Sequence, residues 1–207
     1  KKAEFYETCD KFGIPYPKTV VLTEKADPSA LSPDVLGFPY PIIVKPSSSV
    51  DYWKHPFDGM KKVYVAKTVE EAVSILDAIY GAGYPDKMIL QEFIPGGDSQ
   101  MRVLTTFSDQ NGKVRAMCLG HTMLEEHTPK GLGNHAAIVT EPVSDLPVAA
   151  RIKAMLESVG YTGFGNFDIK CNPDDPTGKD YRVFEINLRQ GRSNFYVTAA
   201  GLNIAYL

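Results

Sequence analysis

Apolar residues return along the first part of the chain with the spacing of a helix. In residues 2–12, Phe5, Cys9 and Phe12 lie three or four positions apart, and Gly13 follows directly. This spacing predicts an amphipathic helix that ends at the glycine, because glycine readily adopts the backbone conformation that terminates helices. A second helix is expected from Thr68, which begins a capping box with a glutamate three residues later, to about residue 80.

Shorter apolar runs bounded by proline, glycine and polar residues predict strands. In the first half of the chain they cover residues 19–22, 41–46, 62–66 and 88–93. A long polar segment, residues 47–60, separates the second run from the third. The last of these runs is stopped by Pro95-Gly96-Gly97.

After that break, strand patterns dominate. They cover residues 101–107, 113–120 and 136–139, with a long polar loop expected at 121–134 and a helix at 148–159. The predicted fold class is therefore α+β, or α/β as the alternative, with two lobes and mostly antiparallel sheets. We expect a lead-in helix and linker at 1–17, a small lobe at 18–95 and a larger lobe at 96–207.

Two acidic residues and an amide mark the end of the larger predicted lobe. Asp168 lies in the segment NFDIK, and Glu185 and Asn187 lie in VFEIN, with a polar turn between the segments. The two segments read as a hairpin, in which alternation directs Glu185 and Asn187 to one face, and Asp168 can face them. Three hard oxygen ligands on one face suit Mg²⁺.

The alternative is that these three residues are ordinary exposed positions of a half-buried sheet. Against this alternative, the opposite face is already supplied by Phe167, Ile169, Phe184 and Ile186. Carboxylates opposed across a hairpin also repel each other, and a cation relieves that repulsion. Arg189 and Arg192 follow at once, and acidic metal ligands beside arginines indicate phosphoryl transfer.

Candidate nucleotide contacts in the smaller predicted lobe are weaker. Lys45 ends an apolar strand, where its ammonium group can neutralise phosphate, although a surface lysine is the simpler explanation. Ser47, Ser48 and Ser49 begin a segment that resembles a flexible cover with hydroxyl and amide donors. Lys61 or Lys62 at its end can reach phosphate or remain solvated.

The segment around Pro95 has the character of a hinge between the lobes. The backbone of Glu92 and Ile94 can pair with an adenine edge there, and Asp98 can accept hydrogen bonds from ribose hydroxyls. Taken alone, the same residues describe an edge strand and a turn.

Composition excludes several classes of function. The net charge of −3 comes with dispersed lysines and arginines, which argues against extended nucleic-acid binding. Three cysteines without CxxC spacing indicate reduced thiols and a cytoplasmic protein. No apolar run approaches the ~20 residues that span a bilayer. The four histidines form no HExxH motif, and GxSxG is absent, so a zinc protease or serine hydrolase is not indicated.

Several of these segments occur together in a recognisable order. PIIVKP, the polar segment, ILQEFIPGGD, GFGNFDIK and VFEINLRQGRSN resemble the ATP-grasp superfamily of carboxylate–amine ligases over residues 14–200. The stretches MCLGHTMLEEHTPKGLGNHAAIV and FEINLRQGRSNFYVT look especially like its D-aspartate ligase branch. Carbamoyl-phosphate-synthase-like ligases share much of the nucleotide site and remain an alternative.

The resemblance implies a fold in which the two lobes grip ATP, and it implies a role for each candidate. Lys45, with the three serines and Lys61 or Lys62, would contact the phosphates. Glu92, Ile94 and Asp98 would hold adenine and ribose. The ions would be Mg²⁺, or Mn²⁺ in its place, held by Asp168, Glu185 and Asn187. Arg189 would stabilise the transferred phosphoryl group, and Arg192 with Ser193 would hold the substrate carboxylate. The roles of Arg102, which stands where many members carry an acid, and of His121 and His135 are left open.

The implied reaction joins a small carboxylic acid, D-aspartate by the branch resemblance, to an amine through an acyl phosphate, with a peptidoglycan precursor as a candidate acceptor. A non-catalytic nucleotide-binding module is the rival reading. The chain lacks an initial methionine and stops within an apolar pattern. We therefore expect a piece of a longer protein whose preceding α/β domain and C-terminal end lie outside it, so that the piece alone is expected to be inactive.

Overall fold

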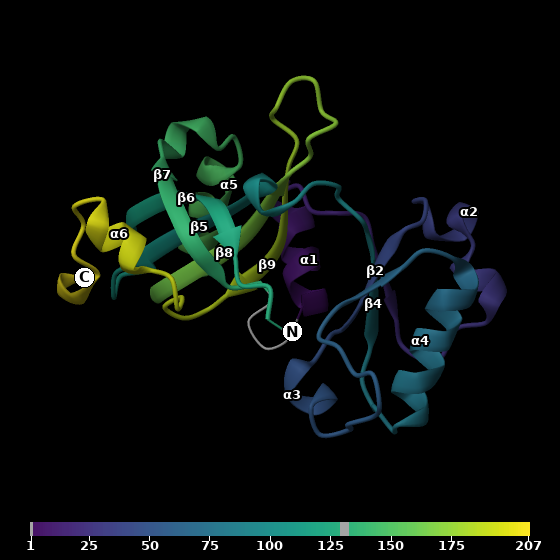
Figure 1. Ribbon diagram of the computed structural model, residues 1–207. Coiled ribbons are helices and arrows are strands. Elements are labelled where there is room, and N and C mark those ends of the chain that lie inside the picture. The colour runs from purple at the N-terminus through teal and green to yellow at the C-terminus, as the bar shows by residue number, and fades with distance from the viewer. Residues whose placement is uncertain (1, 129–132) are drawn as a thin grey trace. The chain divides into compact units, whose positions relative to one another are not determined.

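The computed structural model describes residues 2–128 and 133–207, and the chain divides into two compact units (Figure 1). The first unit contains residues 17–93 and the chain before Phe5, and the second contains Phe5–Tyr16 and Ile94–Leu207. Most of the expected lead-in therefore belongs to the second unit. This includes the greater part of helix α1 (Lys2–Phe12), which ends where the sequence predicts.

The first unit is built on a four-stranded antiparallel sheet with the order β1-β4-β2-β3. These strands, as predicted in type and order, are β1 (Thr19–Leu22), β2 (Ile42–Pro46), β3 (Tyr64–Ala66) and β4 (Met88–Glu92). Its helices are α2 (Pro33–Leu36), α3 (Ser49–Tyr52) and α4 (Val69–Gly81), with a 3₁₀ helix at Pro28–Leu31. The Thr68 hydroxyl caps α4 by accepting from the Glu71 amide at 3.2 Å, which confirms the predicted helix start.

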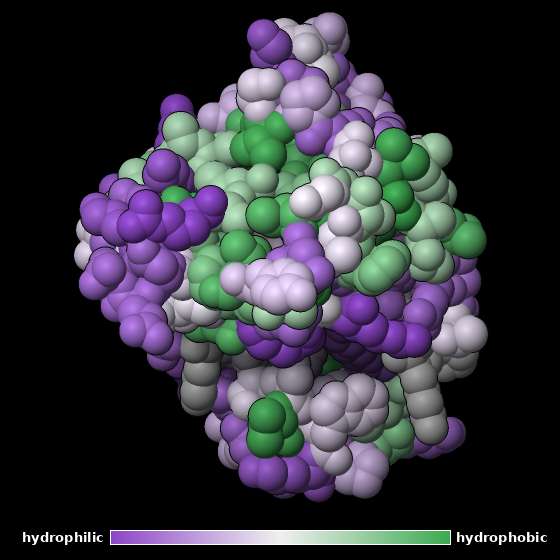
Figure 2. Space-filling view, turned by 90° about the vertical axis from the view of Figure 1, so that its left-hand side faces the viewer, coloured by the Kyte–Doolittle hydropathy of each residue, from purple (hydrophilic) through white to green (hydrophobic). Residues whose placement is uncertain are grey.

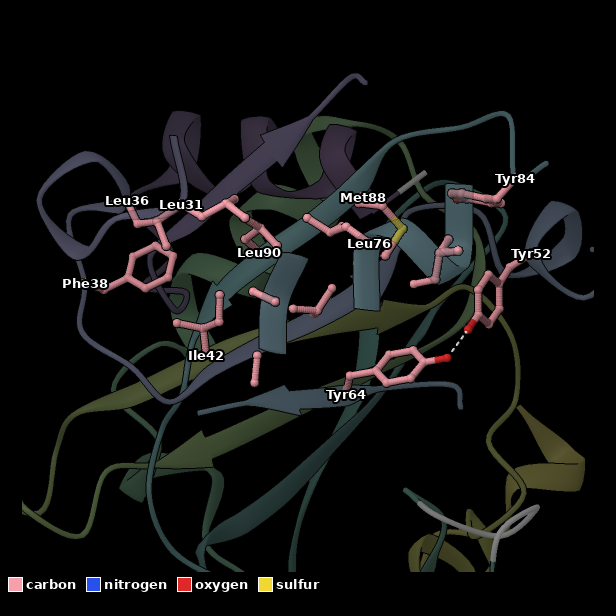
Figure 3. Close-up of a cluster of buried hydrophobic side chains, with 14 residues drawn as sticks. Leu31, Leu36, Phe38, Ile42, Tyr52, Tyr64, Leu76, Tyr84, Met88 and Leu90 are labelled. Atoms are coloured by element: carbon pink, nitrogen blue, oxygen red, sulfur yellow. Dashed lines mark hydrogen bonds between the residues drawn. The ribbon is translucent and has the colours of Figure 1, made fainter. Parts of the chain in front are cut away.

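The core of the first unit lies between α4 and the sheet (Figure 3). Ala72, Leu76 and Ile79 form the buried face of α4, with the spacing that a single helical stripe requires. Part of the segment expected to be a flexible cover is also built into this core. Tyr52 of α3 is buried, and its hydroxyl lies 2.8 Å from that of Tyr64.

The second unit contains a five-stranded antiparallel sheet with the order β7-β6-β5-β8-β9. Its strands are β5 (Met101–Ser108), β6 (Val114–Glu125), β7 (His135–Glu141), β8 (Gly163–Cys171) and β9 (Tyr181–Asn187). Helices α5 (Ala149–Ser158) and α6 (Phe195–Ala199) complete it, with 3₁₀ helices at Asp98–Gln100, Val143–Asp145 and Ile204–Tyr206. The apolar pattern at the end of the sequence forms a 3₁₀ helix after α6.

Strand β6 is longer than the sequence predicts, and the expected loop at 121–134 is wrong for its first five residues. The polar character of this part suggested a loop. Pairing decides otherwise, because Thr122 pairs with Ile138 of β7 and its side chain is buried. Residues 129–132 of the expected loop lie outside the described residues.

The two faces of the second sheet differ in chemistry. On β8, Phe167 and Ile169 are fully buried on one face, while Asn166 and Asp168 belong to the other. Val103 pairs with Asp168 and clusters with Tyr196 and Val197, which places α6 on the Asp168 face. Among the described residues, no helix is long and apolar enough to cross a membrane.

Candidate functional site

The predicted oxygen ligands meet on the ladder between β8 and β9. Asp168 pairs directly with Glu185, and Asn187 pairs with Asn166. The side-chain amide of Asn187 donates to Oδ2 of Asp168 at 3.2 Å. The predicted juxtaposition of these three residues is therefore present in the fold, and all three are half-buried.

One detail of this ladder differs from strict alternation. The register shifts after Asp168, so that Ile169 pairs with Val183 and Phe184 is passed over. Val183 is therefore the fully buried apolar residue of β9, while Phe184 and Ile186, expected on the apolar face, are half-buried. A bulge of this kind turns side chains locally and is frequent beside functional sites.

The donor set on this ladder fits a hard divalent cation. Within residues 2–128 and 133–207, no group of three or more His, Cys, Asp or Glu side chains is arranged to hold a metal. The set predicted here contains two carboxylates and one amide, and Mg²⁺ commonly takes few protein oxygens and completes its octahedron with water and phosphate. Opposed carboxylates on adjacent strands are also the arrangement that a cation stabilises.

A small cavity of about 70 Å³ opens beside the ladder. Five of the predicted site residues line it together, namely Asp168, Asn187, Arg189, Arg192 and Ser193. The remaining lining residues are Val103, Gly133, Asn134, His135, Asn166 and Gly191. Residues from β5, β7, β8, β9 and the segment after β9 thus converge on one polar pocket with both acidic and basic side chains.

The two arginines of this pocket are exposed, and they have different partners. Nη2 of Arg192 lies 3.0 Å from Oε1 of Glu126, and the Arg192 side chain is 70% exposed. Nη1 of Arg189 donates to the carbonyl of Gln190 at 3.2 Å. Exposed guanidinium groups with few partners remain available for an anionic ligand.

His135 is a residue of this pocket to which the sequence assigned no role. Its side chain is 6% exposed, and Nδ1 lies 2.8 Å from Oγ1 of Thr122. Nε2 lies 3.7 Å from Oδ1 of Asp168 and has no hydrogen-bond partner within the described chain. The only signal in the sequence was the position of His135 at the end of the polar loop. Its place in the pocket depends on the pairing of β7, which the local sequence does not show.

Glu125 adjoins His135 and was missed entirely. Its Oε1 is buried without a hydrogen-bond partner among the described residues. Burial raises the pKa of Glu125; His135 opposes this effect, while the charges of Asp98 and Asp168 add to it. No sequence motif marks this residue, because it was assigned to a loop.

Asp98 and Ile94 lie in the second unit. Oδ2 of Asp98 accepts from the backbone amide of Glu125 and from Nε2 of His127, each at 2.9 Å. These bonds, led by the one from the Glu125 amide, lower the pKa of Asp98. Asp98 is thus an ionised acceptor tied to the end of β6, and Ile94 is buried.

In the first unit, Lys45 does not emerge from its strand end as expected. It is only 5% exposed, and Nζ donates to Oε1 of Gln91 at 2.9 Å. Gln91 in turn donates to Oγ1 of Thr19 at 2.8 Å. The reason is tertiary, because pairing with β4 covers β2 and places Gln91 within reach of the lysine.

The structure places the other candidates of the first unit as follows. Ser48 caps α3, with its hydroxyl 2.7 Å from Oδ2 of Asp51. Ser47 is buried, and its hydroxyl has no partner among the described residues, while Ser49 begins α3. Glu92 accepts from the Lys18 amide at 3.1 Å. Lys61 and Lys62 are exposed.

Arg102 is held by an ion pair in the second unit. Nε and Nη2 donate to the two carboxylate oxygens of Glu141 at 2.7 and 3.3 Å. His121 joins this cluster, with Nδ1 2.7 Å from Oε1 of the same glutamate. Val103 pairs with Asp168 across the ladder, so both side chains lie on one face of the sheet. Arg102 is the neighbour of Val103 on β5, and its side chain therefore lies on the opposite face.

A second hollow lies between β7 and α6 and is mostly apolar at its rim. Figure 2 looks onto the side of the molecule on which α6 lies in Figure 1, where apolar side chains are exposed between polar ones. Phe195 and Val139 are exposed apolar residues of this region, and both line the hollow. It shares only His135 and Ser193 with the pocket beside Asp168.

Comparison with known proteins shows the family and the fold of the chain. No family model matches the chain. The chain is 47% identical over 204 residues to a D-aspartate ligase of Enterococcus faecium (strain Aus0004). The aligned region covers 99% of this chain and 47% of that protein. The chain is a homologue of D-aspartate ligase. This homologue spans about half the length of the curated relative that it matches.

Solved structures show that this D-aspartate ligase homologue has the ATP-grasp fold. A D-alanine–D-alanine ligase from Bacillus anthracis, complexed with ATP, matches 97% of the chain with a TM-score of 0.62 and 18% identity. The match covers 61% of that structure. A biotin carboxylase domain from Hydrogenobacter thermophilus matches 93% of the chain with a TM-score of 0.67 and 13% identity, over 40% of its own length. The predicted fold class is confirmed.

Proposed function

We propose that this chain is the nucleotide-using part of an ATP-dependent ligase that joins a small carboxylic acid to an amine. The observation that carries the proposal is the pairing of Asp168 with Glu185, beside a pocket that Asp168 lines together with Arg189 and Arg192. Homology to a D-aspartate ligase supports D-aspartate as the acid. A peptidoglycan precursor is the candidate amine acceptor.

The proposed roles follow from the chemistry of each side chain. Asp168, Glu185 and Asn187 hold Mg²⁺, with Mn²⁺ as a substitute; the bound ion supplies positive charge to phosphate oxygens. Arg189 stabilises the transferred phosphoryl group, and Arg192 with Ser193 holds the carboxylate of the acid. Lys45, Ser47, Ser48 and Ser49 contact the phosphates. The backbone of Glu92 and Ile94 binds adenine, and Asp98 accepts from ribose.

Catalysis of such a reaction is mainly a matter of position and charge. The acid and the γ-phosphate are both anions, so they repel each other until positive groups lie around them. Arg189 and Arg192 supply fixed positive charge at the pocket, and fixed charges stabilise a transition state without reorganisation. The acid oxygen attacks the γ-phosphorus, ADP leaves, and an amine then displaces phosphate from the acyl phosphate to form the amide.

The test is phosphate release by the full-length protein with ATP and Mg²⁺ across D- and L-amino acids, each with and without an amine acceptor. Release that depends on D-aspartate supports the proposed acid. Release that depends on another acid keeps the ligase proposal and replaces the substrate.

An Asp168→Asn variant is the matched control for this assay, because it keeps the shape of the side chain and removes its charge. ATP binding without release above that control, for every acid tested, would replace the ligase by a nucleotide-binding module. Release that requires bicarbonate would favour a carbamoyl-phosphate-synthase-like reaction.

A further inference from the structure

Beneath the pocket lies a chain of buried polar side chains that leads to the backbone of Arg189. The hydroxyl of Tyr196 donates to Oγ1 of Thr105 at 2.8 Å. Thr105 donates to Oδ1 of Asn166 at 2.7 Å, and Nδ2 of Asn166 donates to the carbonyl oxygen of Arg189 at 2.7 Å. These bonds connect α6, β5 and β8 in turn to the segment that follows β9.

The direction of the bonds at Asn166 follows from chemistry. The carbonyl of Arg189 can only accept, so the Asn166 amide must present its nitrogen there and its oxygen to Thr105. Thr105 has one hydroxyl proton, and of the two amide oxygens within its reach that of Asn166 is nearer than that of Asn194, at 2.7 against 3.2 Å. Hydrogen bonds aligned head to tail polarise one another, and burial strengthens each of them.

The network is as buried as an apolar core. Thr105 and Asn166 are each 3% exposed. Burial raises the pKa of Tyr196, so its hydroxyl keeps its proton and remains a donor. A buried polar group that loses its partner is costly, so the arrangement strongly favours one position of the Arg189 backbone.

Gly191 gives independent support, because the segment packs tightly on the same amides. A Cβ atom at Gly191 would lie 2.5 Å from Oδ1 of Asn194 and 3.0 Å from Oδ1 of Asn166. Those atoms belong to buried side chains, so they cannot move aside easily. The turn between Arg189 and Ser193 is therefore held from below by hydrogen bonding and by close approach.

We propose that Asn166 is a positioning residue that holds the segment from Leu188 to Asn194 at the pocket, so that Arg189 and Arg192 are presented in one geometry. It acts through the backbone of Arg189 rather than through contact with reacting atoms. The catalytic consequence rests on the proposed function, whereas the positioning itself does not.

The test compares three variants of the full-length protein. Asn166→Leu keeps the approximate shape of the side chain and removes both hydrogen bonds of Asn166. Thr105→Val removes the hydroxyl that links Asn166 to Tyr196 and keeps the bond from Asn166 to the Arg189 carbonyl. Thr106→Val is the matched control: its hydroxyl is also buried and also bonds across β5 and β8, to the carbonyl of Gly165 at 3.1 Å, but it is not part of the network.

Hydrogen exchange of the amides in residues 188–194 measures the positioning directly. We expect exchange to become about fivefold or more faster in Asn166→Leu, and less so in Thr105→Val, since each loses part of one buried network. Thr106→Val should leave these amides unchanged. Equal exchange in Asn166→Leu and Thr106→Val would overturn the proposal, even where both variants lose the same global stability.

Steady-state kinetics measure the catalytic consequence. We expect kcat of acid-dependent phosphate release to fall about tenfold or more in Asn166→Leu, with a higher KM for the acid, because small misplacement of charged groups is costly. The Thr105→Val substitution should add little in the Asn166→Leu background, because both act through one chain. Faster exchange with unchanged kcat and KM would refute the catalytic role and keep the positioning. A wild type without acid-dependent release would refute the proposed function, and exchange would still decide the positioning.

Discussion

The polar side chains of the two units differ in what they do for the fold. In the first unit, Lys45 is bonded to Gln91, and Ser48 caps a helix, so these candidates also hold their own unit together. In the second unit, Asp168 opposes Glu185 on a ladder and adjoins a pocket with exposed arginines. Opposed like charges do not stabilise a sheet. The comparison shows that a polar residue indicates a functional role most clearly where its placement lowers the stability of the fold.

The largest effect is expected from Glu185→Gln, which removes one of the two opposed carboxylates. Acid-dependent phosphate release should fall by more than ~100-fold, as for the loss of one preorganised charge-stabilising group. The melting temperature without metal should stay the same or rise, because repulsion on the ladder is relieved. Mg²⁺ with ATP should raise the melting temperature of the wild type more than that of the variant. Near-normal turnover would defeat the metal assignment.

A direct contrast between the units comes from Lys45→Met and Arg189→Met. Both should reduce phosphate release in the full-length protein. Lys45→Met should also lower the free energy of unfolding by roughly 1–3 kcal/mol, because the buried Oε1 of Gln91 loses this donor. Arg189→Met should change it by less than about 0.5 kcal/mol, since the side chain is exposed. Urea denaturation measures the free energy of unfolding of each variant. Equal losses in Lys45→Met and Arg189→Met would contradict the proposed difference between the units.

A smaller effect, confined to stability, is expected from Thr68→Ala. Loss of this helix cap should lower the free energy of unfolding by about 1 kcal/mol, with kcat and KM unchanged. Ser48→Ala is the matched cap on a helix of only four residues, and it should cost less stability. Ser48→Ala should in addition lower turnover, because Ser48 is proposed to contact the phosphates; turnover unchanged in both variants would contradict that role.

The smallest effect concerns pH and the hairpin turn before β9. Hydrogen bonds from the Thr177 hydroxyl and from nearby backbone amides lower the pKa of Asp175 from 3.8 to about 2. A lowered pKa means that the ionised form stabilises the folded state at pH values above the ordinary carboxyl range. This stabilisation should disappear as the pH falls from about 4 through 2. The difference in melting temperature between the wild type and Asp175→Ala should shrink over that interval; a difference independent of pH would contradict the assignment.

Local patterns accounted for much of the fold. The strands β1 to β4, helix α4 with its Thr68 cap and the hairpin of β8 and β9 were predicted because alternation, helical spacing and turn residues are properties of neighbouring positions. The pairing of Asp168 with Glu185 followed for the same reason, since a hairpin brings together residues that are close in sequence.

Long-range pairing accounted for the errors and omissions. The extension of β6 to Glu125 depends on β7, and the burial of Lys45 depends on β4, so neither is visible in local composition. His135 and Asn166 are ordinary polar residues in the sequence. Only the sheet order places one beside Asp168 and the other beneath Arg189.

The sequence by itself determined the class of fold, the placement of the candidate oxygen ligands on one hairpin and the resemblance to ATP-grasp ligases, because each depends on residues a few positions apart. The tertiary structure alone decided which of the candidate side chains line a common pocket, which are held within the core, and which buried amide supports the arginine segment. The physical reason is that these outcomes depend on which strands become neighbours. That choice is made by the burial of the whole apolar surface rather than by any short stretch of the chain.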